Sequence, residues 1–212
     1  MKLLVKGGRV VDPASGRDAV GDVFIVDGRI APGGGAPDRT LDAGGLVVAP
    51  GLIDLCARLR EPGYEHKATL ESEMDAAVAG GVTSLACPPD TDPPLDEPGL
   101  VEMLTRRASS LESARVHPVG ALTVGLKGER LAEMAELTEA GCVGFSQGHA
   151  PLPGTATLLN AFKYAATLGY TVWLRPEDPG LGSGGVAHDG EVATRLGLAA
   201  VPAIAETLAI RA

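Results

Sequence analysis

Side chains that could bind a metal ion or an anion gather directly after four apolar runs of the sequence. These stretches are residues 54–63, 87–93, 145–151 and 174–178. Cys56 could bind zinc as a thiolate, because zinc accepts sulfur ligands. Arg58 and Arg175 could not bind a metal, because a guanidinium stays protonated and has no lone pair to donate. Together with Arg60, these two arginines could instead form a basic pocket for a small anion.

Apolar runs alternate with amphipathic segments around these stretches, and this alternation predicts strands that alternate with helices. The expected strands are residues 47–59, 82–89, 114–124, 142–148 and 170–178. The expected helices are residues 69–81, 98–110, 130–141, 156–169 and 200–212. Five such units in succession predict a parallel sheet with helices outside it. In a barrel of this kind, chemistry takes place at the carboxyl ends of the strands, which is where the four stretches fall.

The chain is expected to contain two domains. Residues 1–48 carry β-branched residues punctuated by Gly and Asp, which predicts a small β module. Residues 49–212 suit a (β/α)8 barrel or an open doubly wound sheet, although no Gly-x-Gly-x-x-Gly motif supports dinucleotide binding. A complete barrel needs eight units and about 250 residues. We therefore expect an open sheet or the first part of a barrel, incomplete at the C-terminus.

The composition of the 212 residues argues against several classes of partner. A formal net charge of −9 disfavours nucleic acid and anionic membranes, which attract basic surfaces. No apolar run approaches the roughly 18 residues of a membrane span, and the run after Met1 and Lys2 is too short for a signal peptide. Three widely spaced cysteines predict no disulfide framework and favour a cytoplasmic protein.

Five stretches, in order, resemble motifs of dihydroorotase, a member of the amidohydrolase superfamily. The stretch APGLIDLCARLREPG is similar to PGLID-x-H-x-HLREPG, and CPPDTDPPLD is similar to MPNTxPxxD. GFSQGHAPLP resembles FSDDGxPL, LRPEDPGLGSGGVAHDG resembles HxEDxxLxxGGxxxxG, and GLAAVPAIAETLAIRA resembles GLPxxPxxAExxxIxR. The resemblance implies an α/β fold, the (β/α)8 TIM barrel of the amidohydrolase type. It also implies that the N-terminal β module is part of a composite β-sandwich.

The positions at which this family binds zinc carry different residues in this chain. The resemblance places the two histidine ligands of strand 1 at Cys56 and Arg58, and the acidic ligand after strand 4 at Gln147. The histidine that ends strand 5 falls at Arg175. Two guanidinium groups would repel a dication, so we expect no metal, no cofactor and no catalytic residue here. In an alternative, His149 and Cys56 bind zinc in a rewired site.

The residues that bind the substrate carboxylate in this family are only partly retained. An arginine and an asparagine of the family motifs fall at Arg60 and Asp90. Asp90 would repel a carboxylate, because an ionised aspartate only accepts hydrogen bonds. Arg60 and Asp90 are therefore candidates for a vestigial substrate-binding pair, and we expect Arg60 to form a salt bridge with Glu61.

Acidic residues remain next to the degenerate metal positions. A buried arginine without a carboxylate would be costly. We therefore expect Asp54, Glu177 and Asp178 to pair with Arg58 and Arg175, so that a salt-bridge network fills the former metal cavity.

Three functions follow as hypotheses from these observations. The resemblance implies first a non-catalytic, homo-oligomeric dihydroorotase-like protein of pyrimidine biosynthesis, a structural partner of aspartate carbamoyltransferase. The second is an active zinc-dependent dihydroorotase or related cyclic amidohydrolase with an atypical metal site. The third is a protein that binds a small anion in the vacated cleft.

Overall fold

The computed structural model describes residues 1–33 and 35–211 and divides the chain into two compact units. The first unit is Met1–Gly51 and the second is Leu52–Ala212. The division lies close to residue 48, where the sequence pattern changes from β-rich to alternating. Among the described residues, no helix is both long enough and apolar enough to cross a membrane.

The first unit is a five-stranded sheet built around its longest strand. Its strands are β1 (Lys2–Asp12), β2 (Arg17–Val26), β3 (Arg29–Ala31), β4 (Arg39–Asp42) and β5 (Val47–Val48). Strand β1 is antiparallel to β2 and parallel to both β4 and β5. Asp27 and Gly28 connect β2 to β3 with positive φ angles of 48° and 77°. The Asp-Gly pair suits this turn, because a two-residue hairpin needs left-handed backbone at both positions.

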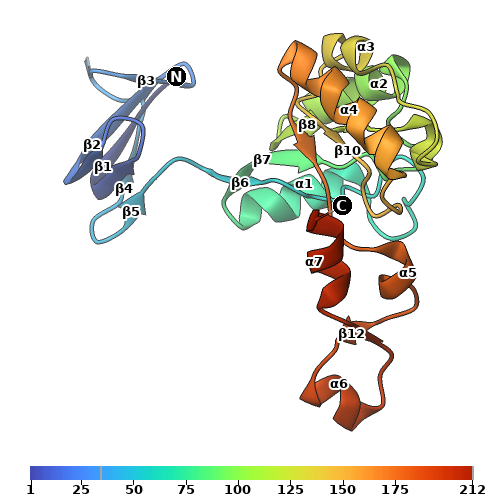
Figure 1. The fold of residues 1–212 in the computed structure, drawn as a ribbon. Coiled ribbons are helices and arrows are strands. Elements are labelled where there is room, and N and C mark those ends of the chain that lie inside the picture. Colours follow the sequence, from blue (N-terminus) through green and yellow to red (C-terminus); the bar gives the residue numbers. More distant parts are fainter. Residues whose placement is uncertain (34, 212) are drawn as a thin grey trace. The chain divides into compact units, whose positions relative to one another are not determined.

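Strands and helices alternate through the second unit (Figure 1). Its strands are β6 (Leu52–Asp54), β7 (Val82–Cys87), β8 (Arg115–Pro118), β9 (Gly120–Ala121), β10 (Phe145–Ser146), β11 (Val172–Trp173), β12 (Ala187–His188) and β13 (Ala200–Val201). Its helices are α1 (Leu70–Ala79), α2 (Pro98–Ser110), the 3-10 turn η1 (Val124–Leu126), α3 (Met134–Glu139), α4 (Thr155–Leu168), α5 (Pro179–Gly182), α6 (Glu191–Leu196) and α7 (Ile204–Arg211).

The strands from β6 to β11 are parallel and pair in the order of the sequence. Strand β7 lies between β6 and β8, and β10 lies between β9 and β11. Strands β8 and β9 are consecutive parts of one extended segment. The Val119 N–H donates to the Cys87 carbonyl at 2.8 Å, and the Gly120 N–H donates to the Gly144 carbonyl at 2.9 Å. The segment therefore joins both groups of strands, and the predicted parallel sheet is confirmed.

Helix termini follow the signals in the sequence. Thr69 caps α1 with a reciprocal pair of hydrogen bonds to Ser72, and the helix ends at Gly80. Pro98 occupies the first turn of α2, where its missing N–H removes no hydrogen bond. Gly169 ends α4 in the left-handed conformation that glycine adopts without steric cost.

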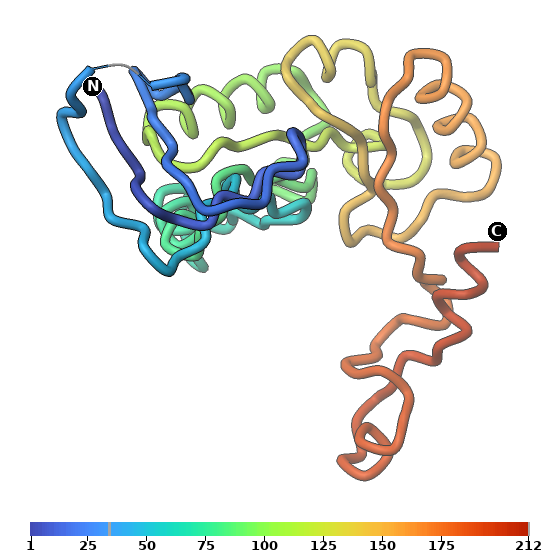
Figure 2. Tube along the Cα trace, turned by 90° about the vertical axis from the view of Figure 1, so that its left-hand side faces the viewer, coloured from blue at the N-terminus to red at the C-terminus, as the bar shows by residue number. Residues whose placement is uncertain are grey.

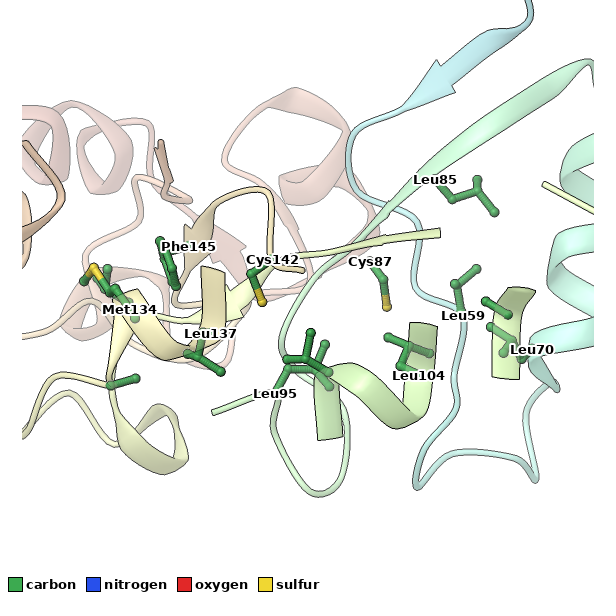
Figure 3. Close-up of a cluster of buried hydrophobic side chains, with 14 of the residues drawn as sticks. Leu59, Leu70, Leu85, Cys87, Leu95, Leu104, Met134, Leu137, Cys142 and Phe145 are labelled. Atoms are coloured by element: carbon green, nitrogen blue, oxygen red, sulfur yellow. The ribbon is translucent and has the colours of Figure 1, made fainter. Parts of the chain in front are cut away.

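The core of the second unit lies between the strands and helices α1 to α4. Figure 3 shows Leu59, Leu70, Leu85 and Leu104 gathered near the Cys87 side chain. Leu70 is fully buried, and the other three leucines are each 2% exposed. Burial of one such side chain contributes about 1.5–3 kcal/mol. This packing fixes the loop after β6 and the end of β7, which carry several of the candidate site residues.

The region after β11 differs from the expected single strand followed by one helix. Figure 2 follows it along the trace from orange to red, through α5, β12, α6 and β13 to α7. The expected helix over 200–212 begins only at Ile204, and β13 occupies Ala200–Val201. Pro202 explains the shift, because the residue before a proline is disfavoured in helical conformation.

Candidate functional site

A cleft of about 260 Å³ lies at the carboxyl ends of the parallel strands. Its polar wall includes Cys56 and Arg58 after β6, His149 after β10 and Arg175 after β11. Three of the four positions that the resemblance aligned with zinc ligands, Cys56, Arg58 and Arg175, therefore line one cavity. All four side chains follow short strands that the buried core holds in place, and they lie at one edge of the sheet. Apart from Ser146 and Gly148, the remaining wall is apolar and consists of Leu55, Pro88, Val119, Trp173 and Leu174.

Arg58 forms an ion pair with Asp90. Its Nε and Nη2 atoms each lie 3.0 Å from Asp90 Oδ2, and the two side chains are 23% and 19% exposed. The other oxygen, Asp90 Oδ1, is buried and accepts no hydrogen bond from the described residues. Gly148 leaves the space for this carboxylate, because a Cβ atom there would lie 2.9 Å from the Asp90 Cβ. Asp90 is thus the partner of a degenerate metal position.

The expected network of acids is partly right and partly wrong. Glu177 contacts the Arg175 guanidinium, as predicted. Asp54 forms no ion pair with either arginine among the described residues, contrary to the prediction, and its carboxylate instead accepts the Cys56 N–H at 2.8 Å.

Asp178 also has a local role that differs from the expected ion pair. Its carboxylate accepts the N–H groups of Gly180 and Leu181, at 2.9 and 3.0 Å, and caps α5. An aspartate followed by proline commonly caps a helix, so the local sequence carried this signal.

Gln147 is buried and does not line the cleft. Its side-chain N–H donates to the Leu126 carbonyl at 2.9 Å, and its side-chain oxygen accepts from the Thr123 hydroxyl at 3.0 Å. Both ends of the amide are therefore engaged by the segment that follows β9. At this position the chain has a structural amide that holds a loop.

Arg60 and Asp90, the vestigial substrate-binding candidates, both line a small space of about 10 Å³. The expected salt bridge between Arg60 and Glu61 is wrong. Glu61 is 4% exposed, and its carboxylate accepts the Leu70 N–H at 2.9 Å and contacts Arg107 Nη1 at 2.6 Å. Glu61 points inward because the first turn of α1 presents an unsatisfied N–H to it.

His149 lines the cleft and an adjoining cavity of about 190 Å³. Burial, followed by the charge of Arg58, lowers the pKa of His149 below its ordinary value, which favours the neutral ring. Cys56 is exposed, and its Sγ lies 3.6 Å from Arg58 Nη1.

The donor set does not fit zinc. In the described part of the chain, no group of three or more His, Cys, Asp or Glu side chains could hold a metal ion. Cys56 and His149 share the cleft, but Arg58 and Arg175 stand beside them with carboxylate partners of their own. A guanidinium offers no lone pair to a metal, so two donors are left where a zinc site uses three or four.

The apolar wall of the cleft was not predicted from the sequence. Trp173 and Leu174 line it directly before Arg175. Their position at the end of an apolar run was a usable signal, because side chains at the carboxyl ends of such strands face the site.

Comparisons with known proteins agree on one family. Residues 45–212 match the family model described as Dihydro-orotase-like. The chain is 47% identical to a "Dihydroorotase-like protein" of Pseudomonas putida and 46% identical to a "Dihydroorotase" of Pelotomaculum thermopropionicum, in each case over 99% of its length. It spans about half the length of these curated relatives, 51% and 50% respectively.

A solved structure shows the same fold. L-hydantoinase (dihydropyrimidinase) from Arthrobacter aurescens matches 84% of this chain and 41% of its own, with a TM-score of 0.72 and 23% identity. At that identity the likeness concerns the fold alone. The family model, by contrast, matches most of the sequence itself. The chain belongs to the dihydroorotase-like family.

Proposed function

We propose that this chain is part of a dihydroorotase-like protein that has lost zinc-dependent hydrolysis and acts as a structural partner of aspartate carbamoyltransferase in pyrimidine biosynthesis. The observation that carries the proposal is the pair of arginines at metal-ligand positions, each with its own carboxylate. Arg58 pairs with Asp90, and Arg175 contacts Glu177. Bound zinc would supply a polarised carbonyl and a hydroxide at neutral pH, and these side chains offer it no lone pair.

The fold is that of the family, whatever the state of the metal positions. Five parallel strands pair in sequence order, and we infer that they form the first part of a (β/α)8 barrel. We also infer that the sheet of the first unit belongs to a composite β-sandwich, and that the protein is a cytoplasmic homo-oligomer. The partnership with aspartate carbamoyltransferase rests on the family resemblance.

An active zinc-dependent dihydroorotase is the second candidate. The relative from Pelotomaculum thermopropionicum carries the name "Dihydroorotase" and is 46% identical to this chain. In this reading Cys56 and His149, which share the cleft, would be two ligands, and the others would come from outside the described residues.

Metal content decides between the two candidates. The whole protein that contains this chain is loaded with excess zinc, dialysed, and analysed by elemental mass spectrometry beside a variant with Cys56→His, Arg58→His and Arg175→His. We expect less than about a tenth of an equivalent in the chain and uptake by the variant, because imidazole is a zinc ligand. One equivalent or more in the unmodified chain, together with hydrolysis of dihydroorotate, would establish the active enzyme instead.

The partnership is tested separately. A tagged chain expressed in its native host should co-purify with aspartate carbamoyltransferase and elute with it in one peak on size exclusion. Recovery of the tagged chain free of the transferase, at salt concentrations that preserve the transferase assembly, would contradict the scaffold proposal.

A further inference from the structure

The cleft has an uneven distribution of charge. Arg58 and Arg175 line it, and none of the lining residues in the described chain is acidic. Asp90 and Glu177 pair with these arginines but do not belong to the wall of this cleft. A molecule inside the cleft therefore meets guanidinium groups and no carboxylate.

Both arginines keep donors for a ligand. Asp90 engages the Nε and Nη2 atoms of Arg58, whereas Nη1 has only Cys56 Sγ, at 3.6 Å. Sulfur is a weak acceptor, so a carboxylate oxygen would replace it favourably. Arg175 is 54% exposed, and Glu177 is its one ion-pair partner in the described chain. A guanidinium has five N–H donors, so each arginine can bind a second acceptor.

The apolar wall restricts the kind of anion. Leu55, Val119, Trp173 and Leu174 line the cleft beside the arginines. An inorganic anion would leave these side chains in contact with water, whereas an aromatic or aliphatic body would cover them. A single negative charge also suits the site better than two, because Asp90 and Glu177 already neutralise part of the arginine charge.

We propose that this cleft binds a small organic monocarboxylate, whose carboxylate contacts Arg58 and Arg175 and whose apolar body packs against Trp173 and Leu174. The site goes beyond the scaffold function, which requires no ligand. It also needs no metal. The volume of about 260 Å³ accommodates a single ring or a compound of similar size.

Trp173 provides a direct assay, because it is the one tryptophan of the chain and lines the cleft. We would titrate the chain with benzoate, with benzamide as a neutral analogue of the same shape, and with inorganic phosphate. Benzoate should give a saturable change in tryptophan fluorescence and should slow the modification of Cys56 by a thiol reagent. Benzamide and phosphate should bind at least about tenfold more weakly, because charge-assisted bidentate hydrogen bonds require a carboxylate.

Variants test the assignment of residues. Arg175→Gln should weaken benzoate binding about tenfold, because one charge-assisted contact is lost. The double variant Arg58→Gln with Asp90→Asn should weaken it similarly without leaving a carboxylate unpaired. Arg115→Gln is the matched control, because Arg115 is exposed and begins β8, at the opposite end of the strands. The affinity of the Arg115→Gln variant for benzoate should be unchanged.

Several results would overturn the proposal. They are equal binding of benzoate and benzamide, binding of phosphate as tight as that of benzoate, and unchanged affinity in both the Arg175 and the double variant. Each of these can occur with or without zinc uptake or transferase binding, so failure of the site is distinguishable from failure of the proposed function.

Discussion

Replacing Arg58 should destabilise the chain more than replacing Asp90, although the two side chains form one ion pair. The pair is about four-fifths buried, with 23% and 19% of the side chains exposed. Arg58→Met would leave both oxygens of a mostly buried carboxylate without a donor, since Oδ1 already lacks one among the described residues. We expect this variant to cost about 3 kcal/mol, the lower end of the range for breaking a buried pair.

Asp90→Asn should cost only about 1 kcal/mol, because the amide oxygen can still accept from Arg58 and the guanidinium, which lines the open cleft, keeps its contact with water. The double variant Arg58→Met with Asp90→Asn should cost only about 2–3 kcal/mol, no more than Arg58→Met alone, because the second change removes the buried carboxylate that the first leaves unpaired. The coupling energy from the double-mutant cycle should then be about 1–2 kcal/mol, above the range for exposed pairs.

Urea denaturation monitored by Trp173 fluorescence measures these values, and it reports on the second unit because the single tryptophan lies there. Arg175→Met with Glu177→Gln is a control in the same unit, since the Arg175 side chain of that ion pair is 54% exposed. Its coupling should stay below about 1 kcal/mol. Equal costs for Arg58→Met and Asp90→Asn, or a coupling no larger than in the control, would refute the reasoning.

Three further predictions concern the surroundings of the cleft. In urea denaturation, Glu61→Ala should lower the free energy of unfolding by about 2–3 kcal/mol, and Glu61→Gln should lower it by about half of that. The reason is that only the alanine leaves the buried Leu70 N–H without an acceptor. Gln147→Leu should increase hydrogen exchange of the backbone after β9 while β7 stays protected, because Gln147 holds that segment through Thr123 and Leu126. Unchanged exchange of the segment after β9 would contradict this role of Gln147. In the folded chain a thiol reagent should modify Cys56 alone, because burial raises the pKa of Cys87 to about 11 and of Cys142 to about 12. Mass spectrometry of the labelled chain should find one adduct before unfolding and three after it.

Local patterns in the sequence were enough to predict the alternation of strands and helices. Thr69 and Gly80 bound a helix through contacts within a few residues, and Pro98 starts one. The pairing of Glu177 with Arg175 could also be predicted, because the two lie only two positions apart at the end of one strand.

The partners that depend on distant segments could not be predicted. Arg58 reaches Asp90, 32 residues away, and Gln147 reaches Thr123, 24 residues away. Glu61 likewise contacts residues of two helices, Leu70 of α1 and Arg107 of α2. In each case the choice of partner depends on which loops the parallel strands bring to one edge, and no local pattern records that choice.

The order in which the strands pair has a consequence for synthesis. Leu52 pairs with Val82, and Phe145 pairs with Val172, so each strand finds its neighbour only about thirty residues further along the chain. A chain that emerges from the ribosome from its N-terminus can therefore add one strand and one helix at a time to a template already made. Assembly can proceed in the direction of translation, with each completed unit covering the apolar face of the one before it.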